Sequence, residues 1–291
     1  MTSVDRHPFR TNLLENRTVI ITGGGSGLGR STALKCAGLG AKVGIVGRRE
    51  EPLKTVAGEI ESAGAKGAFA SCDVRDPASV KAAFDSIESV LGPVNSLVNN
   101  AAGNFLCASE DLTDNAFDAV VKIVLYGSFH CTRELGRRLI ERKAEGHVLS
   151  ILTTYVTSGS AFVLPSAAAK AGVLALTRSL AVEWAAYGIR LNGISPGPFK
   201  TEGAFSRLLA GDLETQALNR VPSKRFGDHD ELTNLAAYIL SDASPYQTGD
   251  CVTIDGAEAL FSGQQFATFV HLDRAKAKEM MAAIKPKKTA S

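Results

Sequence analysis

The sequence lacks the segments that mark membrane and secreted proteins. No apolar run approaches the ~20 residues that a membrane-spanning helix needs. The first residues, MTSVDRHPFRTNLLENR, contain no continuous apolar core of the signal-peptide kind. The final residues, KPKKTAS, are not a peroxisomal tripeptide signal. We therefore expect a soluble, cytoplasmic protein that has no membrane partner.

Cysteine is scarce as well, and charge of one sign is not in excess. The five cysteines, at positions 36, 72, 107, 131 and 251, include no Cys-x-x-Cys pair, so free thiols in a reducing compartment are the simplest interpretation. The five histidines show no metal-ligand spacing, and we expect no metal site. The formal net charge of +2 gives no reason to expect a nucleic-acid partner.

What the sequence does contain is an alternation of apolar runs and helical segments from residue 18 to about residue 254. Runs that are apolar throughout are typical of parallel strands covered by helices on both faces. We expect one doubly wound (Rossmann) α/β domain of about seven parallel strands, with its ligand site at their carboxyl ends. The domain should span 16–261, between an N-terminal extension (1–15) and a C-terminal extension (262–291) with a helix and a basic tail. The predicted strands are 18–22, 42–47, 68–74, 96–101, 147–152, 189–195 and 251–255, and the predicted helices include 76–91, 114–143 and 167–187.

A glycine-rich segment follows the first predicted strand. VIITGGGSGLGRSTALK (19–35) predicts a strand, a tight turn and a helix. Glycines let the backbone approach a pyrophosphate without Cβ clashes, and the helix N-terminus offers N–H groups to the phosphates. In this context a dinucleotide site is favoured over a merely structural turn. The residues assigned to the cofactor are Gly23, Gly24, Gly25, Ser26, Gly27 and Leu28.

The ends of the next two strands favour a phosphorylated cofactor. Arg48 and Arg49 stand where an NAD-specific site would place an acidic residue for the ribose 2′-hydroxyl. Guanidinium groups suit a 2′-phosphate, so NADPH is the expected cofactor. The alternative is a solvated pair balanced by Glu50 and Glu51. After the third strand, Asp73 could contact the adenine edge.

Five motifs, in order, resemble the short-chain dehydrogenase/reductase superfamily: TGGGSGLG, CDV, NNAAG, the Ser166-to-Lys170 segment and SPGP. The resemblance covers about residues 16–258. It implies hydride transfer at a carbonyl carbon, where a tyrosine gives the oxygen its proton and a lysine both lowers that tyrosine's pKa and holds the nicotinamide ribose. Here Ser166 replaces the tyrosine, Val124 an asparagine and Thr153 a serine. A serine hydroxyl is a far poorer acid and shorter by a ring, so these departures indicate lost or different catalysis.

One subgroup combines the same departures with other residues. The chain resembles the NADPH-dependent 2,4-dienoyl-CoA reductases of fatty-acid oxidation in AAGNF, PGP, GAFSRL and a tyrosine fifteen residues before the lysine. It is nearer their mitochondrial-type branch than the peroxisomal one. The resemblance implies that Tyr155 and Asn104 are catalytic, that Lys170 holds the ribose, and that the protein is a homo-oligomer (dimer or tetramer). It further implies Pro196, Gly197, Pro198 and Phe199 over the nicotinamide, and Arg75, Phe105, Thr113 and Arg207 at the acyl-CoA.

The chemistry of a conjugated thioester is consistent with this assignment. Hydride attack at the far carbon moves electron density through the double bonds to the carbonyl oxygen. Two aimed donors such as Tyr155 and Asn104 could stabilise the resulting dienolate. The proton finally reaches carbon, so a relay to an alcohol oxygen is unnecessary. We therefore expect reduction of 2,4-dienoyl-CoA to 3-enoyl-CoA in the degradation of unsaturated fatty acids.

Two other functions stay open at this point. A carbonyl reductase or alcohol dehydrogenase of the same superfamily could use Tyr155 as its acid. A non-catalytic NADP(H)-binding sensor would also explain the altered relay. Each residue also has a simpler interpretation: Tyr155 as a solvated aromatic, Asn104 as a turn cap, Phe105 as a core residue, and Arg75 and Arg207 as surface charges.

Overall fold

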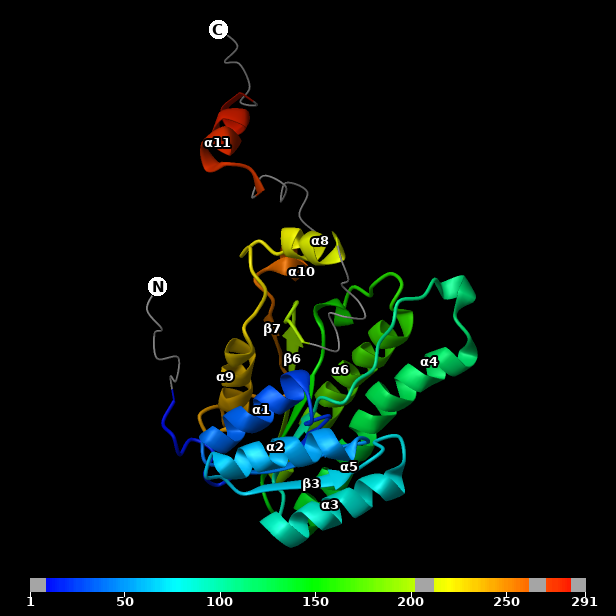
Figure 1. The fold of residues 1–291 in the computed structure, drawn as a ribbon, viewed down its shortest axis with the longest axis vertical. Coiled ribbons are helices and arrows are strands. Elements are labelled where there is room, and N and C mark those ends of the chain that lie inside the picture. The colour runs from blue at the N-terminus through cyan, green and yellow to red at the C-terminus, as the bar shows by residue number, and fades with distance from the viewer. Residues whose placement is uncertain (1–8, 202–211, 262–270, 284–291) are drawn as a thin grey trace.

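The computed structural model describes residues 9–201, 212–261 and 271–283. Within them, seven strands form one parallel sheet in the order β3-β2-β1-β4-β5-β6-β7 (Figure 1). This confirms the predicted doubly wound fold. The order reverses between β1 and β4, and ligands of such sheets bind outside the carboxyl ends at this switch point. The strands are β1 (Thr18–Thr22), β2 (Lys42–Gly47), β3 (Gly67–Ser71), β4 (Ser96–Asn99), β5 (Gly146–Ile151), β6 (Ile189–Pro196) and β7 (Cys251–Ile254).

The central strands are covered on both faces. Every residue of β1, β4 and β5 is buried, whereas the edge strand β7 is only partly covered. Successive side chains of a strand point to opposite faces, and here both directions meet helices. This explains why the apolar runs of the sequence do not alternate with polar residues.

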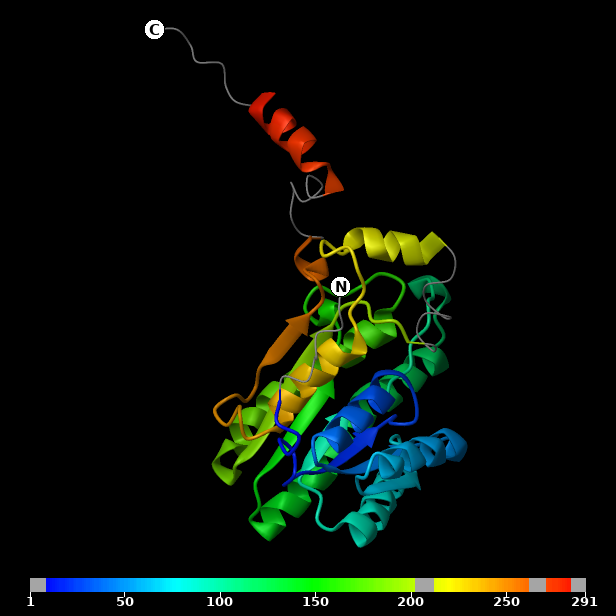
Figure 2. The same cartoon turned by 60° about the vertical axis from the view of Figure 1, so that its left-hand side comes forward.

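Two layers of helices enclose the sheet. One hydrophobic cluster joins a face of the sheet to α1, α2 and α9, and a second joins the other face to α3, α5 and α6. Figure 2 shows α9 lying beside α1 across the strands. The helices are α1 (Gly27–Gly38), α2 (Glu50–Ser62), α3 (Pro77–Leu91), α4 (Asp114–Val121), α5 (Gly127–Arg142), α6 (Leu164–Trp184), α8 (Asp212–Arg220), α9 (His229–Leu240), α10 (Glu258–Phe261) and α11 (Arg274–Ala283), with short turns η1 (Ser109–Asp111), η2 (Lys122–Tyr126), η3 (Thr154–Val156) and η4 (Ala185–Tyr187).

Local sequence explains where helices begin. Asp76 caps α3, because its carboxylate accepts hydrogen bonds from two N–H groups of the first turn and Pro77 follows it. α6 begins at Leu164, three residues before the predicted start, with Pro165 in its first turn. The earlier start places Ser166 inside the helix.

The helix predicted over 114–143 is interrupted. Between α4 and α5 the turn η2 is π-helical, which inserts one extra residue and often occurs at functional sites. Val124 lies in this turn, is fully buried, and its carbonyl accepts a hydrogen bond from Ser128 Oγ at 2.6 Å. The residue that replaces the superfamily's asparagine therefore lies where the helix geometry changes.

The remaining elements lie near the carboxyl edge of the sheet. α8 and α10 lie above the carboxyl ends of β6 and β7 (Figure 1). α11 falls within the C-terminal extension, where the sequence predicts a helix. None of the helices in the described ranges combines the length and apolar composition needed to span a bilayer. All five cysteines are free thiols, as expected from their spacing.

Candidate active site

The glycine-rich turn is fixed by hydrogen bonds that involve the loop after β4. Gly23 has φ +67°, and its N–H donates to Val46 O at 2.7 Å. The Thr22 hydroxyl oxygen accepts bonds from the N–H groups of Asn100 (3.0 Å) and Ala101 (2.9 Å). The Asn100 carboxamide donates to the carbonyls of Thr22 (3.0 Å) and Gly23 (3.4 Å). The turn is thus positioned by side chains from two neighbouring strand ends at the switch point.

The turn has the shape and the open donors that a dinucleotide needs. A Cβ on Gly24 would lie 2.6 Å from Ile45 Cγ2, and one on Gly29 would lie 2.4 Å from Gly23 O, so both positions require glycine. The α1 N-cap, Ser26, makes no side-chain capping bond, and the first turn of α1 carries no acidic residue. Its N–H groups therefore remain available to phosphate oxygens. The residues present fit a pyrophosphate.

The predicted 2′-phosphate residues are exposed. Arg48 and Arg49 form no ion pair with Glu50 or Glu51, or with any other described residue. The geometry therefore does not support the alternative in which Glu50 and Glu51 balance the charges of Arg48 and Arg49.

Asp73 and Arg75 are paired with each other. Arg75 Nε donates to both carboxylate oxygens of Asp73, at 2.9 and 3.0 Å, and its backbone N–H also donates to Asp73. These bonds hold the pKa of the Asp73 carboxyl below its ordinary value, and the charge of Arg48 adds to the effect. Asp73, predicted at the adenine, and Arg75, predicted at the acyl-CoA, thus contact each other at the same edge of the site.

The catalytic candidates meet at the start of α6. Tyr155 lies in η3, after β5, with φ −91° and ψ 18°. Its hydroxyl oxygen lies 3.3 Å from Ser166 Oγ, and Ser166 is buried in the first turn of α6. The phenol on the loop thus reaches the helix position at which the superfamily carries its tyrosine. Lys170 follows Ser166 by one helical turn on the same helix.

Lys170 is buried, and its Nζ donates to Ile151 O at the end of β5. Burial lowers the pKa of Lys170 to about 8. No carboxylate of a described residue forms an ion pair with it. A buried ammonium without a counter-ion stabilises negative charge that appears close to it.

The other residues predicted at the substrate lie on neighbouring loops. Asn104 Oδ1 accepts the N–H of Phe105 at 2.9 Å, which leaves the carboxamide NH₂ as the end free to donate. No hydrogen bond joins Asn104 to Tyr155. Phe105 packs against the small buried cluster around Val124 and α6. Thr113 is exposed and caps α4, and Arg207 lies outside the described residues.

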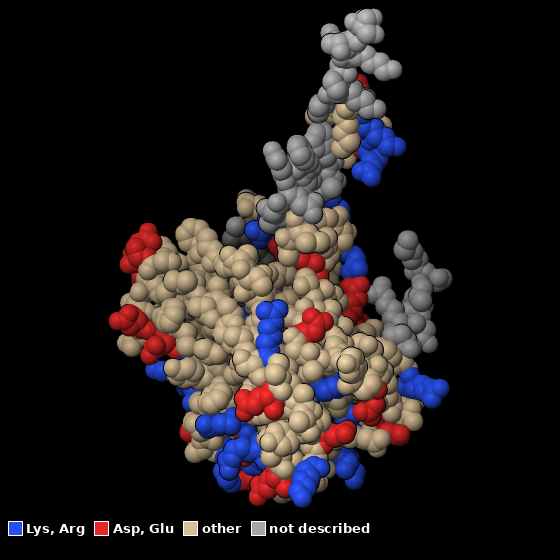
Figure 3. Space-filling model, turned by 180° about the vertical axis from the view of Figure 1, so that it is seen from behind, with Lys and Arg blue, Asp and Glu red and all other residues tan. Residues whose placement is uncertain are grey.

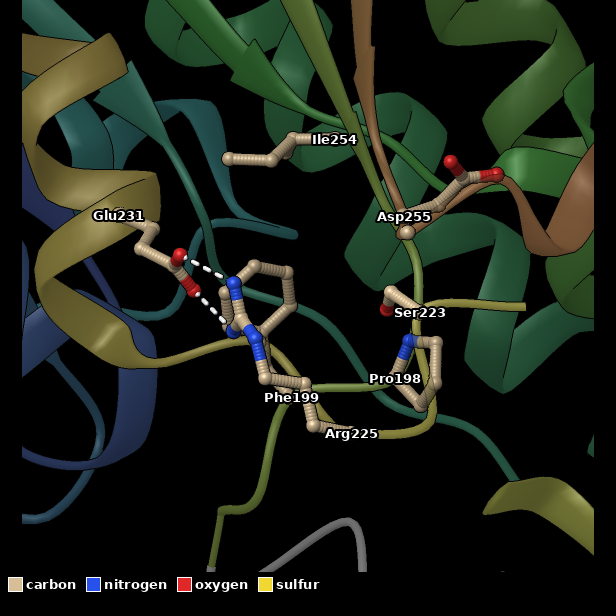
Figure 4. A pocket seen from close by; sticks show the side chains of 9 residues that line it. Pro198, Phe199, Ser223, Arg225, Glu231, Ile254 and Asp255 are labelled. Atoms are coloured by element: carbon tan, nitrogen blue, oxygen red, sulfur yellow. Dashed lines mark hydrogen bonds and ion pairs between the residues drawn. The ribbon is translucent and has the colours of Figure 1, made fainter. Parts of the chain in front are cut away.

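The Pro196–Phe199 stretch forms the wall of the site beyond β6. Gly197 N–H donates to Ile254 O at 3.0 Å. Phe199 is buried, and a Cβ on Gly227 would lie 2.3 Å from its ring. The ring therefore faces Gly227 and the core, so the stretch can approach a cofactor only through its backbone and prolines. Figure 4 shows Pro198 and Phe199 beside the Arg225–Glu231 ion pair, around a pocket of about 110 Å³, which is too small for a nucleotide.

One residue at the cofactor turn was missed by the sequence reasoning. The side chain of Thr201 lies 3.4 to 3.5 Å from the position that a Cβ on Gly27 would occupy. It therefore stands directly over the glycine-rich turn. Its position five residues after Pro196 was the available signal, but the prediction ended at Phe199.

Relatives of this chain share its whole domain. A family model described as enoyl-(acyl carrier protein) reductase matches residues 23–257. A Bacillus subtilis protein named as a probable 2,4-dienoyl-CoA reductase, (2E)-enoyl-CoA-producing, is 42% identical over 249 residues, which are 85% of this chain and 98% of the relative. A Caenorhabditis elegans protein named as a probable 2,4-dienoyl-CoA reductase 3, (3E)-enoyl-CoA-producing, is 40% identical over 271 residues, which are 90% and 87% of the two chains.

Solved structures give the same result for the fold. A short chain dehydrogenase from Bacillus anthracis is 38% identical with a TM-score of 0.80, covering 88% of this chain and 100% of that one. A gluconate 5-dehydrogenase from Burkholderia cenocepacia, in complex with NADP and tartrate, is 30% identical with a TM-score of 0.81, covering 86% and 98%. The family model matches most of the chain, and each of these relatives and structures is at least 30% identical over most of its own length. The chain belongs to the short-chain dehydrogenase/reductase superfamily of oxidoreductases.

Proposed function

We propose that this protein is an NADPH-dependent 2,4-dienoyl-CoA reductase acting in the degradation of unsaturated fatty acids. The observation that carries the proposal is the 3.3 Å separation between the Tyr155 hydroxyl and Ser166 Oγ, one helical turn before Lys170. A phenol in this place can act as a donor although the usual helix position holds serine. The two relatives named as dienoyl-CoA reductases, at 40% and 42% identity, support the substrate class.

The cofactor residues of this proposal are those of the glycine-rich turn, with Arg48 and Arg49 for the 2′-phosphate and Lys170 for the nicotinamide ribose. NADPH, when bound, supplies the hydride. The open N–H groups at the start of α1, and the two guanidinium groups that pair with no residue in the described ranges, suit its phosphates. Arg48 and Arg49 are exposed, so they can orient without breaking another contact.

Tyr155 and Asn104 stabilise the thioester oxygen in this proposal. Negative charge develops on that oxygen as the conjugated system accepts the hydride. A phenol O–H and a carboxamide N–H donate to it, and such donors act most strongly where they strengthen as charge appears. The bond from Phe105 N–H to Asn104 Oδ1 supports the assignment, because it occupies the oxygen of the amide and leaves its NH₂ end to donate.

Lys170 supplies charge next to the phenol. Its ammonium is buried and lies on the same helix as Ser166, one turn further on. A positive charge in this position favours electron density on the Tyr155 oxygen as the phenol donates its hydrogen bond. Lys170 thus has two roles here, at the ribose and at the developing oxyanion.

The loops beside these residues suit an apolar acyl chain. Leu106 and Phe162 are 52% and 60% exposed, so both present apolar surface that an acyl chain could cover. The two loops are tied together, because Cys107 N–H donates to Phe162 O at 2.9 Å. We assign Phe105 and Thr113 to the same substrate and Arg75 to the CoA, where a phosphate can compete with Asp73 for its guanidinium.

The position of the product double bond depends on where the proton is delivered. Protonation next to the carbonyl leaves the double bond at carbon 3, and protonation at the opposite end of the dienolate leaves it at carbon 2. The names of the two relatives differ in this respect. We expect the 3-enoyl product, as in the mitochondrial-type reductases that the motifs resemble.

The test is an assay of NADPH oxidation with a 2,4-dienoyl-CoA, in parallel with a panel of ketones, followed by identification of the product by NMR. We expect turnover of the dienoyl-CoA and a 3-enoyl product. A 2-enoyl product would contradict the protonation site alone. Turnover of a ketone without the dienoyl-CoA would make the protein a carbonyl reductase. NADPH binding with no turnover of any substrate would support the sensor.

A further inference from the structure

A histidine links two walls of the cofactor site. His229 is the first residue of α9, which lies beside α1 (Figures 1 and 2). Its Nδ1 lies 2.6 Å from Ser31 Oγ, on α1, and its Nε2 lies 2.6 Å from Lys200 O, just after β6. The ring thus spans the gap between the helix that begins at the glycine-rich turn and the chain segment that leads away from Phe199.

Only one arrangement of hydrogens satisfies both bonds of a neutral imidazole. A carbonyl oxygen accepts only, so Nε2 carries the hydrogen and donates to Lys200 O. Nδ1 then accepts from the Ser31 hydroxyl. Ser31 Oγ also lies 3.2 Å from Gly27 O, and its single hydrogen serves either Nδ1 or this carbonyl, so the serine lies between the imidazole and the backbone of the glycine-rich turn. The tautomer is fixed by its surroundings.

The segment that His229 holds stands over that same turn. Thr201, next to Lys200, lies against Gly27, with its side chain 3.4 to 3.5 Å from the point that a Cβ on this glycine would occupy. Upstream, Gly227 N–H donates to Pro198 O at 3.1 Å, and Phe199 forms a parallel bridge with Gly227. The chain is therefore held to the start of α9 at both Pro198 and Lys200, and His229 connects it further to Ser31 of α1. At Lys200 the backbone carbonyl is held by the His229 side chain, while the ammonium of Lys200 pairs with Glu214.

The surroundings of His229 allow its side chain to be changed without undoing α9. A capping box formed by Asp228 and Glu231 holds the start of the helix through other atoms. The ring is half-buried beside a hollow of about 530 Å³ between α1 and α9, rather than inside the packed core. The charged groups around the hollow are Asp228, Asp230 and Lys35, and the last two form an ion pair at 3.2 Å.

We propose that His229 is a positioning residue for the nicotinamide cofactor. Through Lys200 and Ser31 it sets the spacing between the Pro196–Thr201 wall and the glycine-rich turn, so that the free protein already has the spacing of the bound state. Preorganised spacing strengthens binding because less order remains to be imposed when the ligand arrives. The inference rests on the proposed NADPH site but not on the identity of the acyl substrate.

The test measures cofactor binding without any acyl-CoA, by the fluorescence of NADPH titrated with protein. His229→Phe keeps a ring and removes both hydrogen bonds, and we expect about a tenfold rise in Kd, as for two ordinary bonds. NADH should lose affinity by the same factor, because the bridge acts away from the 2′-phosphate. In turnover, KM for the cofactor should rise while kcat changes little. Ser31→Ala should give part of the same loss and add nothing to His229→Phe.

Two controls separate positioning from a general loss of structure. His229→Gln retains an amide donor and acceptor and should recover part of the affinity, while His271→Phe, an exposed histidine paired with Lys224, should leave Kd unchanged. An unchanged Kd in His229→Phe would overturn the proposal, as would additive losses with Ser31→Ala. A wild-type protein that binds NADPH but reduces no dienoyl-CoA would refute the proposed function and leave this test intact.

Discussion

The small side chain of Ser166 leaves space for the phenol ring of Tyr155. The Tyr155 hydroxyl approaches α6 from the loop after β5 and ends 3.3 Å from Ser166 Oγ. A side chain much larger than serine at position 166 would overlap the phenol, since interiors leave no space for a second ring. The serine and the displaced tyrosine are therefore two parts of one change. They keep a phenol at the helix position one turn before Lys170 but bring it in from a different element.

The cofactor preference is a residue-scale property of Arg48 and Arg49. Both are exposed and form no ion pair with a described residue, so their contribution should appear only when a 2′-phosphate binds. In Arg48→Ala/Arg49→Ala we expect NADPH affinity to fall by about 10²-fold, with NADH affinity changed less than about twofold. Fluorescence titration of both cofactors measures the ratio. Equal losses would contradict 2′-phosphate recognition.

Single side chains were the hardest part of the site to predict. The sequence indicated Gly23 and Gly24 because a glycine pattern after a strand has few alternative uses. It gave no sign that Arg75 pairs with Asp73, since that choice depends on rotamers. The buried direction of the Phe199 ring depends on Gly227, which lies 28 positions later. The His229 bridge joins three segments that no short motif connects.

At the scale of elements, the strands followed from sequence, whereas the break in the long helix did not. Apolar runs bounded by glycine and polar residues gave all seven strands to within a few residues. The π turn at Lys122–Tyr126 contains no glycine or proline from which it could have been predicted. Such a turn arises because side chains on both sides of it pack best with one residue added, and only the assembled core decides this.

The start of β5 carries a titratable group that makes the fold sensitive to acid. His147 is buried, with no hydrogen-bond partner for Nδ1, and it lies near the charges of Arg17 and Arg190. Burial, with the added repulsion of both arginines, lowers the pKa of His147 to about 2. The imidazole therefore stays neutral in the folded protein at any ordinary pH.

The lowered pKa of His147 determines in which direction the free energy of unfolding changes with pH. Below about pH 6.5 this histidine is protonated in the unfolded chain but stays neutral in the folded protein. The free energy of unfolding therefore falls as pH falls, by about 1.4 kcal/mol per pH unit from this group. In His147→Phe this part of the slope should be missing. Urea unfolding of both proteins between about pH 5 and 7.5 measures the difference. Parallel slopes would contradict a neutral His147.

At the scale of the whole molecule, the distribution of charged and apolar side chains on the surface favours association between copies of the chain. On the side where α4 and α6 lie, the upper left of Figure 3, charged side chains are few and stand mainly at the rim. The α5 and α6 region exposes large apolar side chains, which in a monomer would face water. They are Tyr126, Phe129, Leu164 and Val182, which are 38% to 83% exposed.

We propose that copies of the chain associate through these helices. Light scattering after gel filtration should give two or four times the 30.6 kDa of one chain. Phe129→Glu should lower that mass, because it places a charge in the contact. Val90→Glu, at an exposed site on α3, is the control that should not change it. A monomer at micromolar concentration would contradict the proposal.

The central claim is that the phenol of Tyr155 performs the work for which the superfamily uses its helix tyrosine. The most direct measurement compares the turnover of a 2,4-dienoyl-CoA by Tyr155→Phe and Ser166→Ala, with the NADPH Kd of each variant as control. We predict a loss of about 10²-fold or more for Tyr155→Phe with an unchanged Kd, and a loss of only a few fold for Ser166→Ala. Full activity in Tyr155→Phe together with an inactive Ser166→Ala would contradict the account.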